Sequence, residues 1–217
     1  MLGINKLKVK LEKELPVLGT WNTLASPLVT EVFAQSGLDF QIIDLEHGPF
    51  ILDKLNLHVS ACENSPSCSP LVRIPSNEDW MSLQVLDQGA HGVVVPHISN
   101  RKAAEKLAKS IKYYPFGERG FTPFSKAGGF NNNNTSDYLK NANESILSVV
   151  IIESEEGLKN LDEILDVEGI DYWILEVLPE KLSKIVVLEY NPTFGPNLEI
   201  TIPNSKNFDR KKYHYSH

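Results

Sequence analysis

The stretch LVRIPSNEDWMSLQVLDQGAHGVVVPH, Leu71–His97, decides the expected fold. Its two ends are short and almost wholly apolar, which is typical of strands buried on both faces of a parallel sheet. The centre predicts a helix that begins at the capping-box-like pair Ser76 and Asp79 and ends at Gly89. A strand, a helix and a second strand in this order form one βαβ unit.

The same alternation extends along the chain in both directions. Strands are expected at residues 17–21, 40–46, 70–75, 92–97, 146–154 and 169–177, with helical segments between them. No GxGxxG follows the first strand and no Walker loop is present, which favours a barrel over a dinucleotide-binding fold. A closed eight-stranded barrel needs ~250 residues. The 217 residues of this chain therefore predict an α/β, TIM-barrel-like (β/α) repeat that is incomplete, with about six strand–helix units.

Composition narrows the class of protein. Hydrophobic residues make up 41% and charged residues 23%, which indicates a globular domain. The formal net charge of −7 and the lack of a basic stripe argue against nucleic-acid binding. No apolar run approaches the ~18 residues of a membrane helix, and the first residues lack a signal-peptide core, so we expect a cytoplasmic protein. Cys62 and Cys68 are expected to be reduced thiols.

Ionisable side chains follow several of the expected strands. They are Asp44, Glu46 and His47 after the second strand, Arg73 in the third, His97 after the fourth and Glu153 in the fifth. In a parallel α/β barrel the carboxyl ends of all strands lie on one face, and that face holds the site. The pattern therefore predicts that an imidazole, a guanidinium and a carboxylate converge there.

Each of these residues also has a purely structural interpretation. His47 could be a hydrogen-bonded histidine at a strand end, Arg73 could simply pair with a carboxylate, and Glu153 could stabilise the start of the next helix. His91 and His97 flank the fourth strand and are interpreted as structural.

Asp87 stands out because it shares an apolar helical face with Trp80 and Leu83. A carboxylate on such a face needs a partner, and a nearby imidazole would serve.

Four collinear segments resemble the HpcH/HpaI aldolase family, which consists of metal-dependent class II aldolases with pyruvate as the nucleophile. The segments are LGTWNTLASPLVTEVFAQSGLDFQIIDLEHGPF, LVRIPSNEDWMSLQVLDQGAHGVVVPHI, YYPFGERGF and VVIIESEEGLKNLDEILDVEGID. The resemblance covers about residues 18–171. The D-x-E-H strand end, the lone arginine after the third strand and the G-x-R-G segment are specific in combination.

The resemblance implies roles for single residues. His47 matches the base that moves a proton, and Asp87 matches the aspartate that pairs with this histidine and orients it. Arg73 matches the arginine that contacts the pyruvate oxygens and stabilises the enolate. Trp21 and Arg119 match segments that line or cover the substrate site.

The resemblance also implies a cofactor and partners. Glu153 matches a ligand of a divalent metal, and oxygen ligands suit Mg²⁺ or Mn²⁺. The substrates would be pyruvate and an aldehyde, and the family's subunits assemble into homo-oligomers in which neighbours help to close the site. The implied function is therefore that of a carbon–carbon lyase acting on 2-keto-hydroxy acids through a metal-bound pyruvate enolate.

The family pattern stops near Asp171. Pro179 stands where the family has a second metal-binding carboxylate, and Glu176 and Glu180 do not match that motif. We therefore expect an aldolase domain over residues 1–177 and a divergent tail over 178–217, disordered or altered by a frameshift or gene truncation near codon 172. The alternative function is a degenerate, non-catalytic family member that acts as a structural partner or is a non-functional fragment.

Overall fold

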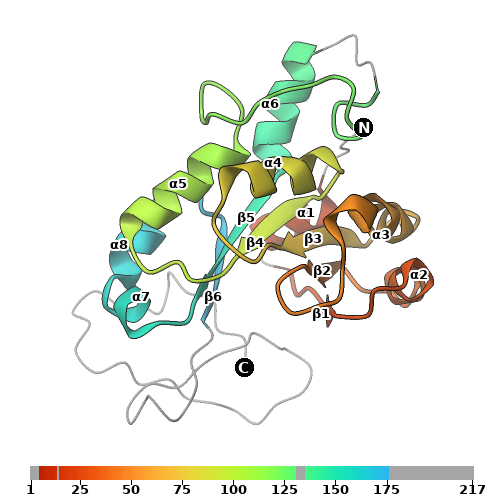
Figure 1. Ribbon diagram of the computed structural model, residues 1–217, viewed down its shortest axis with the longest axis horizontal. Helices are drawn as coiled ribbons and strands as arrows, with labels where there is room; N and C mark the ends of the chain where they lie inside the picture. Colours follow the sequence, from red (N-terminus) through yellow and green to blue (C-terminus); the bar gives the residue numbers. More distant parts are fainter. Residues whose placement is uncertain (1–4, 14, 131–134, 176–217) are drawn as a thin grey trace.

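The computed structural model describes residues 5–13, 15–130 and 135–175 (Figure 1). The expected domain boundary at residue 177, the divergent tail and the replacement at Pro179 lie outside these residues.

The strands form one parallel sheet. They are β1 (Gly19–Asn22), β2 (Phe40–Asp44), β3 (Ser69–Arg73), β4 (Gly92–Val95), β5 (Leu147–Ile152) and β6 (Tyr172–Leu175). Their order in the sheet is the order in the sequence, and each strand pairs in parallel with the next. The described strands thus form a barrel segment that β1 and β6 leave open, which confirms the expected incomplete TIM-barrel-like fold.

Adjacent residues of the inner strands enter different apolar clusters. Ile42 and Val149 belong to a cluster on one face of the sheet, which also contains Leu7. Ile43 and Val150 belong to the larger cluster, in which the sheet packs against the surrounding helices. Because successive strand side chains point to opposite faces, a sheet covered on both faces needs apolar residues at nearly every position. This explains why the strands lack polar alternation.

Helices connect the strands and lie around them (Figure 1). They are α1 (Lys6–Glu12), α2 (Pro27–Gln35), α3 (Leu55–Glu63), α4 (Asp79–Asp87), α5 (Arg101–Ile111), α6 (Thr135–Ser145), α7 (Glu155–Lys159) and α8 (Leu161–Leu165), with a 3₁₀ turn at Leu52–Lys54 before α3. As expected, Pro27 begins α2, and Gly37 follows its end with a φ of +95°, which favours glycine.

Two expected helix boundaries were wrong. Ser76 does not cap α4, because Glu78 occupies the N-cap position and makes no side-chain cap hydrogen bond. The helical segment expected between the fifth and sixth strands is broken at Asn160 into α7 and α8. The Asn160 side-chain amide donates to the carbonyl of Ser99 at 2.9 Å. This contact with the segment after β4 accompanies the break.

Helix α1 closes the amino-terminal edge of the sheet and was absent from the expected elements. Asn5, its N-cap residue, donates from Nδ2 to the carbonyls of His91 at 3.1 Å and Ser145 at 2.9 Å, and its Oδ1 accepts from the Ser69 hydroxyl at 3.1 Å. These partners lie next to the starts of β4, β5 and β3. One buried carboxamide therefore ties three strand starts together.

The two cysteines are free and buried in a small apolar cluster. Their sulfur atoms lie 3.3 Å apart, and the Gln41 side-chain amide donates to each at 3.7 Å. Among the described residues, no helix has the length and apolarity needed to cross a membrane.

Candidate functional site

A buried ion pair joins the carboxyl ends of β2 and β3, where Asp44 and Arg73 are register partners. Arg73 donates from Nε to Oδ1 of Asp44 at 2.9 Å and from Nη2 to Oδ2 at 2.5 Å. The same Oδ1 accepts the backbone N–H groups of Glu46 at 3.0 Å and His47 at 3.1 Å. Asp44 is 1% exposed. Asp44 therefore holds both the arginine and the loop after β2.

The surroundings of Asp44 stabilise its charged form. Burial alone would raise the pKa of this carboxyl group, but the hydrogen bond and charge of Arg73 and the backbone N–H groups of His47 and Glu46 outweigh burial and lower the pKa. The carboxylate is thus ionised at neutral pH although it is shielded from solvent.

Arg73 is held from three sides. Besides its pair with Asp44, its Nη1 lies 3.2 Å from Oε2 of Glu46. Its guanidinium carbon lies 4.3 Å from the ring centroid of Trp21, a cation–π contact from β1. A planar guanidinium with two carboxylate partners and an aromatic face has little freedom to turn. The structure thus brings Trp21 and Arg73 together, as the sequence analysis expected.

His97 connects this group to Glu153. Its backbone N–H donates to Oε1 of Glu153 at 2.7 Å, and its ring Nδ1 lies 2.8 Å from the same oxygen. Its Nε2 lies 3.4 Å from Oε1 of Glu46. The residue has a φ of +60°, in the left-handed region. Polar contacts therefore run without interruption across the ends of β2, β3, β4 and β5.

His47 lies at the rim of this network. Its side chain is 70% exposed, and its Nε2 lies 3.8 Å from Oε2 of Glu46. The imidazole is therefore accessible to a small molecule while the backbone beneath it is anchored on Asp44.

The expected pairing of Asp87 with His47 does not occur within the described chain. Asp87 accepts instead from Nη2 of Arg119 at 2.8 Å. The reason is topological, because His47 follows the carboxyl end of β2 whereas Asp87 ends α4, the helix that returns the chain to the start of β4.

Arg119 also lies away from the expected place. It follows α5, and its backbone N–H donates to the carbonyl of Lys112, whose Nζ donates to the carbonyl of Ile146 just before β5. Its side chain is fully buried and lies over the ring of Tyr113, 4.5 Å from the centroid. Arg119 thus belongs to the amino-terminal edge of the sheet and does not line the strand-end site of its own chain.

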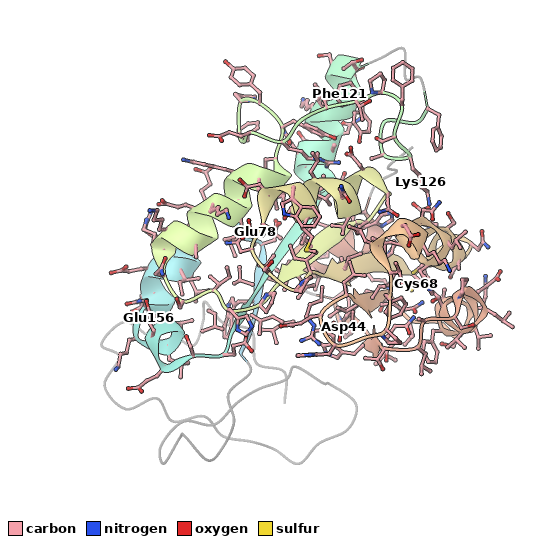
Figure 2. All side chains as sticks on the ribbon, viewed as in Figure 1. Asp44, Cys68, Glu78, Phe121, Lys126 and Glu156 are labelled. Atoms are coloured by element: carbon pink, nitrogen blue, oxygen red, sulfur yellow. The ribbon has the colours of Figure 1, made fainter. Side chains whose placement is uncertain are left out.

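Figure 2 shows this separation of the two edges. Asp44 and Glu156, at the end of β2 and after β5, lie in the lower part of the view. Phe121 and Lys126, from the segment that follows Arg119, lie in the upper part. The part of this connection that carries Phe121 and Lys126 thus lies away from Asp44 in this view, whereas the resemblance of the G-x-R-G segment to the family had led us to expect it over the site.

Two residues of the network have a larger part in it than their sequence context indicated. Glu46 was named only as one of the polar residues after the second strand, yet its two oxygens contact Arg73 and His97. His97 was interpreted as structural, yet its side chain is 67% exposed and bridges two carboxylates. The sequence did contain one indication of the place of His97 in the network, because this residue directly follows β4 and so lies at the same edge as Arg73.

Glu153 has the chemistry of a metal ligand. Its hydrogen bond and its ion-pair contact with His97 both involve Oε1, and within the described residues neither a hydrogen bond nor an ion pair engages Oε2. Carboxylate oxygens are the ligands that Mg²⁺ and Mn²⁺ prefer. Over residues 5–13, 15–130 and 135–175, no group of three His, Cys, Asp or Glu side chains is arranged to hold a metal ion. Glu153 therefore fits as one ligand of a site that this part of the chain does not complete.

The fold defines a (β/α)-barrel-like protein, and its polar network lies at the carboxyl ends of the strands, the edge at which such barrels carry their sites. The sequence profile of the HpcH/HpaI aldolase/citrate lyase family matches residues 18–176. The chain belongs to this family.

Individual relatives agree with this result. A 5-keto-4-deoxy-D-glucarate aldolase from Salmonella arizonae is 35% identical over 167 residues, which are 77% of this chain and 64% of that protein. The crystal structure of the citrate synthase SbnG has a TM-score of 0.70 and 34% identity, covering 79% of this chain and 65% of its own. A family member from Burkholderia cenocepacia has a TM-score of 0.73 and 28% identity, with coverages of 79% and 68%. The chain thus spans slightly less than two thirds of the curated relatives it matches.

Proposed function

We propose that this chain is a class II aldolase, a carbon–carbon lyase that forms or cleaves 2-keto-hydroxy acids with pyruvate as the nucleophilic partner and an aldehyde as the acceptor. The observation that carries the proposal is the oriented Arg73 guanidinium beside an accessible His47 at the strand-end edge. The name of the Salmonella relative supports the reaction class.

Removal of a proton from the pyruvate methyl group creates an enolate, whose negative charge must be stabilised. Arg73 would contact the carboxylate and enolate oxygens, and its fixed orientation means that little reorganisation is needed as the charge develops. Asp44 and Glu46, which contact the guanidinium nitrogens, and the Trp21 ring, which lies against the guanidinium carbon, together set that orientation.

His47 would accept the methyl proton and return it in the reverse direction. An imidazole is suited to this task at neutral pH. Its backbone is anchored through Asp44, which fixes where the imidazole stands relative to Arg73.

Glu153 would hold a divalent cation, Mg²⁺ or Mn²⁺, which supplies Lewis-acid stabilisation of the keto and enolate oxygens when bound. The oxygen Oε2, which lacks a partner among the described side chains, is the ligand atom in this proposal.

A homo-oligomer is part of the proposal. Asp87 and His47 lie at opposite edges of one chain, so an Asp87 that orients His47 would have to come from another copy. Mixing His47→Ala and Asp87→Asn variants tests this idea. Recovery of activity in the mixture, with neither variant active alone, would support a shared site.

The activity itself is tested by deuterium exchange into the pyruvate methyl group in the presence of added Mg²⁺ or Mn²⁺. The exchange is monitored by NMR. This assay needs no knowledge of the aldehyde. Exchange that depends on the cation and is lost in His47→Ala is the expected result. Absence of exchange from a folded sample would refute the proposal.

A non-catalytic role is the second candidate. The observation that favours it is the lack of a complete metal-ligand group in the described part of the chain, since hard cations usually need several oxygen ligands. In that case the chain would fold and bind no cation tightly, and the exchange assay would give no signal.

A further inference from the structure

His97 is part of the strand-end network but has no task in the proposed reaction. Its side chain is 67% exposed, so its ring contributes little buried apolar area. Its φ of +60° is disfavoured for any residue that carries a Cβ atom. Packing therefore does not explain a histidine at this position, although histidine is among the residues that tolerate this backbone conformation better than most.

The contacts of His97 are specific. The backbone N–H and ring Nδ1 both meet Oε1 of Glu153, at 2.7 Å and 2.8 Å. The ring Nε2 reaches Oε1 of Glu46, whose other oxygen is 3.2 Å from Arg73. Two contacts from one residue hold Oε1 of Glu153 in place, and Oε2 takes no hydrogen bond or ion pair from the described residues.

We propose that His97 is a positioning residue that orients Glu153 so that Oε2 is presented to a divalent cation, and that it thereby sets the cation affinity of the chain. This inference rests on the proposed role of Glu153 as the cation ligand. Hydrogen bonds that orient a ligating carboxylate commonly change metal affinity 10–100-fold. The left-handed backbone is the conformation that brings the N–H and the ring to the same oxygen.

Two variants distinguish the contribution of the His97 ring from that of its backbone N–H. His97→Gly accepts the left-handed conformation, keeps the backbone N–H and removes the ring. His97→Asn also tolerates this conformation, and its short amide can donate to Glu153 in place of Nδ1 but cannot reach Glu46.

Mn²⁺ binding to the full-length chain is measured in two ways. One is the electron paramagnetic resonance signal of free Mn²⁺, and the other is calorimetry. We expect His97→Gly to weaken Mn²⁺ binding by about 10-fold or more. His97→Asn should recover part of the loss. The thermal midpoint of His97→Gly should equal or exceed that of the wild type, because the backbone strain is relieved. A purely structural histidine would give the opposite pattern, with lower stability and unchanged affinity.

His91 provides a matched control. It precedes β4 as His97 follows it, and its Nε2 pairs with Glu63 at 3.3 Å. His91→Gln removes a histidine–glutamate contact from the opposite edge and should leave Mn²⁺ affinity unchanged.

Three outcomes would overturn the inference: a wild-type chain that binds no Mn²⁺, a His97→Gly variant that binds it equally or more tightly, or a His91→Gln variant that loses as much affinity. The pyruvate exchange assay reports separately on the proposed function. Mn²⁺ binding that depends on His97 without any exchange would retain this inference and refute the aldolase activity.

Discussion

Replacing Asp44 with asparagine tests the buried ion pair that joins β2 to β3. The substitution keeps the shape of the side chain and leaves Oδ1 able to accept the backbone N–H groups of Glu46 and His47. It removes the negative charge, and it sets an amide N–H₂ against Nη2 of Arg73, where Oδ2 now accepts at 2.5 Å. Two donors then face each other in a buried site.

Removing one partner of a buried ion pair typically costs about 3–5 kcal/mol, because the other charge is left uncompensated. Arg73 would keep its contacts with Glu46 at 3.2 Å and with the Trp21 ring, so we expect a cost at the lower end of this energy range. We expect a loss of about 3 kcal/mol in the free energy of unfolding. With a urea m-value of about 2 kcal/mol/M, the midpoint of unfolding falls by about 1.5 M.

The assay is urea unfolding of wild type, Asp44→Asn and a control, followed by circular dichroism. Asp79→Asn is the control, because the Asp79 side chain is 66% exposed and lies 3.7 Å from Lys106. Such surface changes stay within about 0.5 kcal/mol. A midpoint for Asp44→Asn that matches the control would refute the claim that this pair stabilises the sheet edge.

The same pair makes stability depend on pH. The folded-state pKa of Asp44 lies below its ordinary value of 3.8, so the stabilisation is complete above that value and is lost as the pH falls through the folded-state pKa. Wild type should therefore lose stability on acidification below pH 3.8 more steeply than Asp44→Asn. Parallel pH profiles would contradict this assignment.

Three further substitutions probe the rim of the site and the opposite edge. His47→Ala should abolish pyruvate methyl exchange and change the free energy of unfolding by less than about 0.5 kcal/mol, because the side chain is 70% exposed. Arg119→Ala should lower the thermal midpoint by roughly 6–12 °C, because the fully buried guanidinium leaves Asp87 unpaired. Asn5→Ala should cost roughly 2–3 kcal/mol and reduce amide-exchange protection at the strand starts, since its carboxamide makes four hydrogen bonds.

Each of these predictions has a result that contradicts it. Full exchange activity in His47→Ala would remove the base from the proposed reaction. An unchanged thermal midpoint for Arg119→Ala would mean that the buried pair at the amino-terminal edge adds nothing to stability. Uniform loss of amide protection in Asn5→Ala, without any preference for the starts of β3, β4 and β5, would contradict the local role of that side chain.

The strands and their order follow directly from local sequence. Runs such as those at residues 92–95 and 147–152 are apolar at each position because both faces of the sheet are covered, and this pattern is visible without a structure. The position of polar residues after such runs also predicted the edge at which Arg73, His47 and Glu153 gather, since parallel strands share one carboxyl edge.

Helix ends were harder to predict because they depend on contacts distant in sequence. Ser76 had the composition of a cap, yet α4 begins at Asp79. Asn160 sits inside a stretch of helix-forming residues, yet its amide bonds to Ser99, 61 positions earlier. Helix α1 was missed because its stability comes from Asn5 and Leu7 packing on strands far along the chain.

The sequence by itself determined the fold class, the family and the edge that holds the site, because these depend on periodicity and on side-chain type along the chain. Only the tertiary structure decided which side chains pair with one another. It paired Asp87 with Arg119 at one edge and placed His97 between Glu46 and Glu153 at the other. Such pairings depend on how segments distant in sequence meet in space and on backbone angles such as the φ of His97, and neither is encoded in local pattern.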